Sequence, residues 1–445
     1  MDEPASGSGD VDPAAAGHQT SSARWITGAR RRRSTALPTV GEPAPVASRP
    51  APARPRGSWF ARRKVAAVDA ASARAHDSLL SQVSRGERPS QTTRTGAAVV
   101  ALSVTVLVAY AVAVVLLVLA TFAPKNLYGW VGVVIGWLVV VAVAPRPNRL
   151  DDVRPLTIDE CPNLHRHVAV VAAAVGTRPP DALALSTDFN AGVTRVGWGR
   201  RQMLVIGLPL WTLLTDDARL ALLAHEMGHL RARDATTGYV TWTAHGILHR
   251  FATLLTPLPA DAYTDFADHR PMIEESQATM NAVGSFLLRI VSLPATLLLL
   301  LFERLDAVSS QRGEYLADLR AAEVAGSHAL VNLLVTLENV PGLHTLAAAG
   351  VRRREDPFVV LDTVRERPAP TSVQVAAARQ RAREQDLRWD SSHPRDDLRL
   401  SLVEARAAER TLECTDLEHE ADAELARLRN GLARQFADDL IETYH

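Results

Sequence analysis

Two uncharged apolar runs stand out in the first third of the chain. Residues 96–123 form a stretch of 28 residues without a charged side chain, and residues 127–144 form a second stretch after a three-residue break. About 20 apolar residues are enough for a helix to cross the hydrocarbon core of a bilayer. The pattern therefore predicts a transmembrane helical hairpin over 96–146. Two buried helices of a soluble protein are the alternative.

The charges around these runs indicate an orientation. Arg62 and Arg63 precede the hairpin and Arg146 and Arg149 follow it, whereas the short break between the runs carries Lys125 alone. Basic residues are enriched on the cytoplasmic side of membrane helices. We therefore expect both flanks, and with them the large C-terminal part of the chain, to be cytoplasmic.

The segment before the hairpin divides into two parts by composition. Residues 1–57 are rich in Pro, Ala, Ser, Gly and Arg and include four consecutive arginines at 30–33. Such a segment buries too little apolar surface to offset its ordering entropy, so we expect a disordered basic tail rather than a nucleic-acid-binding patch. Residues 58–95 form a juxtamembrane segment, in which the mixture of Arg, Ala, Val and Leu favours a helix over 59–86.

From residue 147 to 445 the pattern indicates a mainly helical domain with a small β-sheet. Helices are expected over 161–175, 215–231, 297–325 and 398–444, and short strands over 182–185 and 203–206. Residues 344–397 are charged and are expected to form loops. The fold class predicted is thus mainly α with a small sheet.

Composition excludes several classes of function. Acidic and basic residues balance at 49 each, so no global field favours nucleic acid. Two cysteines, Cys161 and Cys414, are too few for a disulfide framework or a cysteine-rich zinc site. His165 and His167 are two residues apart and point to different faces of their helix, so we expect them to be ordinary surface residues.

An HExxH motif occupies residues 225–229, within the helix expected over 215–231. Residues i and i+4 of a helix lie one turn apart on the same face, so His225 and His229 can bind one ion. Zinc suits the site because it accepts imidazole and carboxylate ligands and keeps one position open. Glu226 follows the first ligand and can take a proton from the attacking water. A chance occurrence of the motif is the alternative.

A third protein ligand is needed, and the helix expected over 297–325 supplies a candidate. Glu314 and Asp318 are four residues apart on one helix face, so one can bind the metal while the other supports the site. Such a pair by itself is usually a solvated helix face. It gains weight here because it accompanies the HExxH motif.

These motifs resemble those of the M48 family of metallopeptidases, of the HtpX type. Residues 223–229 are similar to the first zinc motif of the family, and residues 314–318 to the second, whose glutamate is the third zinc ligand. The resemblance implies one Zn²⁺ per chain, bound by His225, His229 and Glu314. It also implies a zincin-type (gluzincin) metallopeptidase domain after the membrane hairpin.

Weaker elements extend the resemblance over roughly residues 155–400. They are Asp234, Asn190-Ala191, residues 207–210, and Ser392-His393-Pro394 with Arg399. Asp234, like Asp318, is expected to support the metal ligands. His393 is expected to be catalytic by donating a hydrogen bond to the oxyanion, with an ordinary loop histidine as the alternative.

Substrates of the family are taken to lie along an edge strand, which we expect near residues 203–206 of this chain. Two positions depart from the family pattern. Gly192 stands where a bulkier residue is common, and Arg395 replaces a frequent second proline. These departures weaken the resemblance at the substrate groove and at the late element, but not at the zinc site.

Two further apolar stretches, 239–258 and 283–302, separate the two zinc motifs. Because His225 and Glu314 must reach one ion, they lie on the same side of the bilayer, and the number of complete crossings between them is even. The resemblance favours two crossings. The two histidines and the arginine within the first stretch are costly in hydrocarbon and favour none, which we slightly prefer.

The expected function is that of a membrane-anchored zinc endopeptidase. It would hydrolyse peptide bonds of unfolded or membrane-associated proteins at the cytoplasmic face of a bacterial cell membrane, as a multi-pass protein. Its partners would be protein or peptide substrates and the lipid bilayer, with no nucleic acid. The alternatives are a catalytically inactive zinc-binding scaffold, against which Glu226 argues, and a non-enzymatic membrane anchor, against which Glu314 argues.

Overall fold

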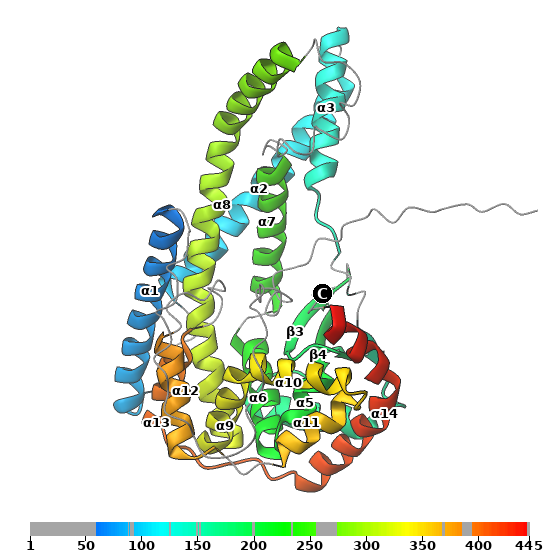
Figure 1. Cartoon of the computed structure of the whole chain (residues 1–445). Coiled ribbons are helices and arrows are strands. Elements are labelled where there is room, and N and C mark those ends of the chain that lie inside the picture. Colours follow the sequence, from blue (N-terminus) through cyan, green and yellow to red (C-terminus); the bar gives the residue numbers. More distant parts are fainter. Residues whose placement is uncertain are drawn as a thin grey trace, which may run out of the picture. The chain divides into compact units, whose positions relative to one another are not determined.

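The computed structural model describes most of the chain after residue 58 (Figure 1). The described ranges are 59–87, 93–123, 126–147, 153–197, 201–232, 235–254, 274–366, 370–384 and 394–442, with Pro89 and Leu150. They all belong to the compact unit Ala53–His445. The tail expected over 1–57, Asp234 and His393 lie outside the described residues.

Three helices precede the globular part: α1 (Trp59–Ser84), α2 (Arg94–Phe122) and α3 (Leu127–Val143). The first falls where a juxtamembrane helix was expected. Among the described helices, α2 alone is long and apolar enough to cross a membrane, and α3 is a shorter apolar helix. Most of the large apolar side chains of α2 and α3 face outward and are exposed. The two helices pack together, and Trp137 Nε1 donates to Thr121 Oγ1 at 3.1 Å.

Two later helices pack against this pair. They are α7 (Ala235–Leu254) and α8 (Glu274–Ala325), the latter about 78 Å long at 1.5 Å per residue. An apolar cluster joins the four helices through Val99, Val106, Val143, Ala244, Ile247, Leu248 and Phe302. The same helix α8 thus carries the whole second apolar stretch and, further along, the second zinc motif.

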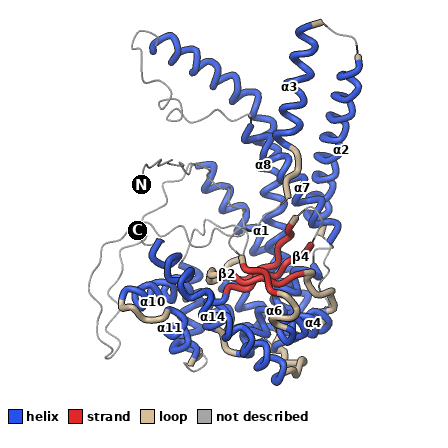
Figure 2. The backbone as a smooth tube through the Cα atoms, turned by 90° about the vertical axis from the view of Figure 1, so that its right-hand side faces the viewer, coloured by secondary structure: helices blue, strands red, loops and turns tan. Residues whose placement is uncertain are grey.

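The sheet is drawn in red in Figure 2. Its four described strands have the order β1-β2-β4-β3. They are β1 (Arg154–Leu156), β2 (Ala182–Ser186), β3 (Ala191–Val196) and β4 (Arg201–Gly207). The β2–β4 pair is parallel and the other two pairs are antiparallel. The prediction of an edge strand at 203–206 is wrong, because β4 is paired on both sides and β3 forms the edge.

The rest of the described chain is helical. The helices are α4 (Pro162–Val175), α5 (Leu208–Leu213), α6 (Asp216–Ala232), α9 (Ser327–Glu338), α10 (Val340–Arg352), α11 (Pro357–Arg365), α12 (Ser372–Glu384), α13 (Asp396–Ala405) and α14 (Thr415–Glu442). The expected loops at 344–397 are wrong for α10, α11 and α12. Val360 and Leu361 of α11 and Ala347 of α10 are buried, so tertiary packing stabilises helices that the charged composition concealed.

Several predicted helix ends are confirmed, because local residues determine them. Gly176 closes α4 with φ of 81°, a left-handed conformation that glycine adopts without strain. Gly326, with φ of 91°, separates α8 from α9. Asp216 and Asp217 occupy the first turn of α6, where the positive end of the helix dipole stabilises their negative charges.

Helix α14 covers α4 and changes the surroundings of the residues beneath it. The Glu424 carboxylate accepts from the backbone N–H groups of Asn163 and Leu164, at 3.0 and 2.9 Å, and so caps the start of α4. Because α14 lies there, His167 is 1% exposed. The prediction of His167 as a surface residue is therefore wrong.

Candidate metal centre

Helix α6 places the HExxH motif in the protein core. Leu220, Leu223, Ala224 and Met227 are buried in the main apolar cluster. His225 and Glu226 are also buried, whereas His229 is partly exposed. The helix is thus fixed by its apolar side chains, and its two histidines border a region that solvent reaches on one side.

A close helix crossing brings the second motif to the first. A Cβ atom added at Gly228 would lie 2.9 Å from Ala317 Cα, so α6 and α8 approach each other there almost backbone to backbone. Gly228 lies between the two histidines in the motif, and Ala317 lies between Glu314 and Asp318. The absence of a side chain at Gly228 therefore allows the polar groups of the two helices to converge.

The three predicted ligands converge at this crossing. The Nε2 atoms of His225 and His229 are 3.0 Å apart. Glu314 Oε2 lies 3.6 Å from His225 Nε2, and Glu314 Oε1 lies 3.4 Å from His229 Nε2. In a tetrahedral site with zinc–ligand bonds of about 2.0–2.2 Å, neighbouring ligand atoms are about 3.3–3.6 Å apart. The two distances to Glu314 lie within this range and the distance between the two Nε2 atoms is slightly shorter, so the residues present fit one zinc ion after a small movement.

Behind His225, a buried carboxylate and an arginine continue the polar network. Asp318 Oδ1 lies 3.0 Å from His225 Nδ1. Arg399 of α13 donates to both oxygens of Asp318, from Nε at 2.8 Å and from Nη2 at 2.7 Å. A carboxylate that contacts the second ring nitrogen of a histidine fixes the orientation of the ring. The network thus runs from α13 through α8 to the imidazole on α6.

The charges of this network favour a cation between the ligands. Burial alone would lower the pKa of His225, but hydrogen bonding with Asp318 and Glu314 and their negative charges raise it to about 10. Burial alone would raise the pKa of Asp318, but the charge and hydrogen bonds of Arg399 lower it to about 2. Asp318 is therefore ionised at neutral pH, and the site strongly favours positive charge at His225.

The side chain of Glu226 extends from α6 to the edge strand β3. The backbone N–H of Val193 in β3 donates to Glu226 Oε2 at 3.3 Å. In the described part of the sheet, β3 has β4 on one side and no strand on the other. The carboxylate of Glu226 is thus held beside backbone groups that an added strand would also use.

Two of the weaker resembling elements meet near the start of β3. The N–H of Gly207 donates to the carbonyl oxygen of Asn190 at 2.8 Å. A Cβ atom at Gly207 would lie 2.0 Å from the carbonyl oxygen of Asp188, so glycine is required by this close approach. At Gly192, in contrast, an added Cβ would meet nothing within 4 Å. Space beside the edge strand is therefore open at the position that departs from the family pattern.

Sequence reasoning missed two contributors to the site. Arg399 was noted only within a weak late element, and its ion pair with Asp318 spans 81 positions of the chain. Helix α1 packs behind the site, where Ser72 Oγ and the Tyr315 hydroxyl share a hydrogen bond of 3.1 Å and Leu79 lies against Tyr315 and Leu319. No signal near residues 72–79 pointed to this contact. Asp234 and His393, outside the described residues, stay predictions.

Comparison with known proteins connects this geometry to a family. The sequence model of peptidase family M48 matches residues 159–407, more than half of the chain. A protease HtpX homolog from Sulfurihydrogenibium sp. is 28% identical over 199 residues, which cover 42% of this chain and 59% of the relative. The chain therefore aligns with less than two thirds of that relative. No solved structure gives a significant match. With the HExxH helix and Glu314 inside the matched region, the chain belongs to the M48 family of metallopeptidases.

Proposed function

We propose that this protein is a membrane-anchored, zinc-dependent endopeptidase that hydrolyses peptide bonds of unfolded or membrane-associated proteins at the cytoplasmic face. One observation carries the proposal. His225, His229 and Glu314 converge at spacings that suit one ion, and Glu226 lies next to them beside the edge strand. A zincin-type arrangement, with the HExxH helix next to the edge of a sheet, would account for both features.

The residues that would hold zinc are His225, His229 and Glu314, with Asp318 and Arg399 orienting His225. When bound, the ion would lower the pKa of a water molecule and polarise the scissile carbonyl. The role of Asp318 is to keep His225 Nδ1 engaged, so that Nε2 faces Glu314. Arg399 keeps Asp318 ionised, as the lowered pKa of the Asp318 carboxyl indicates.

Glu226 would act as the general base. Its carboxylate takes a proton from the attacking water and delivers it to the nitrogen of the leaving amine. The Val193 N–H holds one carboxylate oxygen, which limits the rotation of the side chain and keeps it next to the edge strand. The base is thereby positioned where a substrate backbone on β3 would pass.

The exposed edge of β3 suits an extended polypeptide. A peptide that adds to a sheet edge binds through its backbone N–H and C=O groups, which a folded protein has already paired. This requirement supports unfolded segments as substrates. Open space at Gly192 would admit a bulky substrate side chain next to the strand.

The membrane anchor in this proposal is the α2–α3 hairpin, whose outward apolar surface suits lipid. Arg250 of α7 donates from Nε to the carbonyl oxygen of Val143, the last residue of α3, at 3.2 Å. Arg146 follows soon after, so this end of α3 would be the cytoplasmic one. Because α7 meets that end through Arg250, near the C-terminus of α7, we propose that residues 239–254 do not form a complete crossing.

The first test compares the wild type with Glu226→Gln, both purified as full chains in detergent. Glu226→Gln keeps the size of the side chain, so zinc content should be unchanged while casein cleavage falls by about 10²–10⁴-fold. His225→Ala is the companion variant and should lose both zinc and cleavage. Equal cleavage by wild type and Glu226→Gln would remove the proposed mechanism. Zinc binding without cleavage of casein or of a membrane protein by the wild type would favour the inactive scaffold.

A further inference from the structure

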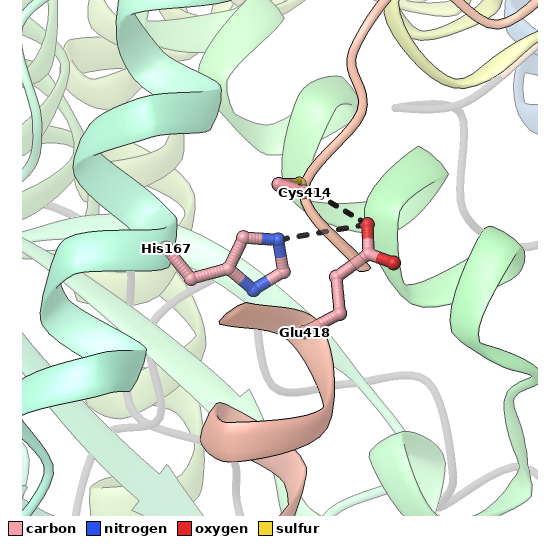
Figure 3. A group of neighbouring side chains, drawn as sticks. All are labelled: His167, Cys414 and Glu418. Atoms are coloured by element: carbon pink, nitrogen blue, oxygen red, sulfur yellow. Dashed lines mark hydrogen bonds and ion pairs between the residues drawn. The ribbon is translucent and has the colours of Figure 1, made fainter. Parts of the chain in front are cut away.

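A second group of metal-ligand side chains, none of them from the HExxH motif, lies where α4 meets the start of α14. Figure 3 shows these side chains. The group consists of His167 on α4, Cys414 directly before α14, and Glu418 in the first turn of α14. One ligand atom from each side chain lies within 4.8 Å of the others. Cys414 Sγ is 3.3 Å from Glu418 Oε1, and His167 Nε2 is 4.0 Å from the same oxygen.

His167 is buried without a hydrogen-bond partner. Both of its ring nitrogens are inaccessible to solvent, and neither has a partner within hydrogen-bonding geometry. Burial, with a smaller contribution from the charge of Arg410, lowers the pKa of His167 to about 4, so the ring is neutral at pH 7. An unsatisfied buried polar group destabilises the fold, and a neutral imidazole is the form that binds metal ions. The ring therefore lacks a partner that a cation would provide.

We propose that His167, Cys414 and Glu418 bind a second divalent metal ion, with zinc as the ion their ligand atoms suit best. Thiolate, imidazole and carboxylate are the three ligand types that zinc accepts in proteins. With a zinc–sulfur bond of about 2.3 Å and shorter bonds to nitrogen and oxygen, tetrahedral ligand atoms lie about 3.3–3.7 Å apart. The distances of 3.3 and 4.0 Å bracket that range, so small movements would complete the site. Water would take the fourth position.

The charges around the group balance for one divalent ion. Arg410 donates to Glu418 Oε1 at 2.7 Å and to Asp217 Oδ1 at 2.6 Å, so it is shared between two carboxylates. Burial and the neighbouring Glu418 raise the pKa of Cys414 to about 12, so that the thiol is protonated without a cation. Metal binding would release this proton to solvent. The resulting thiolate, Glu418 and Asp217 then carry three negative charges and Arg410 one positive charge, so their net charge of −2 balances one divalent ion.

The location of the group indicates a structural role. His167 lies inside the region matched to the M48 family, whereas Cys414 and Glu418 follow its last matched residue, 407. An ion here would join the family domain to the C-terminal helix α14, and the peptidase site would not depend on it for its chemistry. The proposal thus goes beyond the single zinc ion expected from the motif, and it stands or falls independently of the peptidase function.

Metal content of the full chain, dialysed with zinc and then freed of loose metal, tests the proposal. The wild type should hold about two zinc equivalents, and Cys414→Ser and His225→Ala should each hold about one, since each removes a different site. Cys161→Ser is the control, because Cys161 is the other free thiol, buried directly before α4, and its loss should leave about two equivalents. A wild type with about one equivalent, unchanged in Cys414→Ser, would overturn the proposal.

Cobalt substitution gives a second readout that does not require the variant to be stable. The wild type loaded with Co²⁺ alone should show a thiolate-to-cobalt charge-transfer band in the near ultraviolet, which imidazole and carboxylate ligands do not produce. The band should persist in Cys161→Ser and in His225→Ala. Its absence from the wild type, or its loss in Cys161→Ser but not in Cys414→Ser, would show that Cys414 binds no metal.

Discussion

The groups around His225 and His167 differ in how their imidazoles are supported. His225 contacts Asp318, which Arg399 holds in turn, and the pKa of His225 is raised to about 10. His167 has no such support, and burial lowers its pKa to about 4. A network of charged partners gives the first group a fixed geometry before any ligand binds, as catalysis requires. In the second group the His167 ring lacks such partners, so an ion would supply what the ring is missing.

The largest effect is expected from removing the support of His225. Arg399→Leu would leave Asp318 buried without its partner, which costs about 3–5 kcal/mol of unfolding free energy. Zinc affinity should also fall, by about 10–100-fold, because Asp318 would no longer be held on His225. Chemical denaturation and zinc titration measure the two effects.

Arg395→Leu is the matched control for that variant. Arg395 also pairs with a carboxylate, that of Asp397 at 2.9 Å, but its side chain is more exposed than that of Arg399. Arg395→Leu should lower the free energy of unfolding by less than about 1 kcal/mol and leave zinc affinity unchanged. If Arg399→Leu behaved like Arg395→Leu, the network behind His225 would have no role in holding the metal ligand.

The next prediction concerns the opposite pH responses of the two histidines in the metal-free chain. A folded pKa of about 4 for His167, below the unfolded value near 6.5, means that the unfolded chain takes up the proton first. Unfolding free energy should therefore fall by about 3 kcal/mol between pH 6.5 and 4 through this group. His167→Gln should lose that part of the pH dependence, measured by denaturation in EDTA.

The raised pKa of His225 predicts the reverse sign. Its contribution in the metal-free chain is fully present below pH 6.5 and disappears as the pH rises toward 10. His225→Gln should therefore flatten the alkaline side of the stability curve, whereas His167→Gln flattens the acidic side. Identical pH profiles for the two variants would contradict the contrast between the groups.

A smaller effect is expected at the crossing of α6 and α8. Gly228→Ala adds a methyl group that meets the backbone of Ala317, and such overpacking costs about 1–3 kcal/mol. Because the two helices would separate, zinc affinity should fall with stability. Gly313→Ala is the control beside Glu314: its Cβ would meet nothing within 4 Å, so it should be neutral or slightly stabilising. Equal zinc affinity in Gly228→Ala and Gly313→Ala would show that the crossing does not limit the site.

The smallest effect is expected where α1 contacts the back of α8. Ser72→Ala removes the hydrogen bond to Tyr315 and should cost about 1 kcal/mol. Ser81→Ala, on the exposed part of the same helix, should change stability by less than half of that. Denaturation midpoints of the two variants provide the measurement. No difference between them would mean that α1 does not stabilise the helix that carries Glu314.

Features that depend on neighbouring residues were predictable from the sequence. The i, i+4 spacing of His225 and His229 gives them one helix face, and Gly176 and Gly326 end helices through their own backbone freedom. The apolar run of α2 likewise needs no partner to be recognised. These features are local because hydrogen bonding and side-chain direction within a helix repeat over only a few residues.

Only the tertiary structure decided which strand forms the edge, what supports His225, and that His167 is buried. The segment Ala191–Val196 has a weak strand pattern and becomes β3 by pairing with β4. Arg399 reaches Asp318, and α14 covers His167, across long separations in the chain. Such contacts form because distant surfaces exclude water together, and no short stretch of sequence records which surfaces will meet.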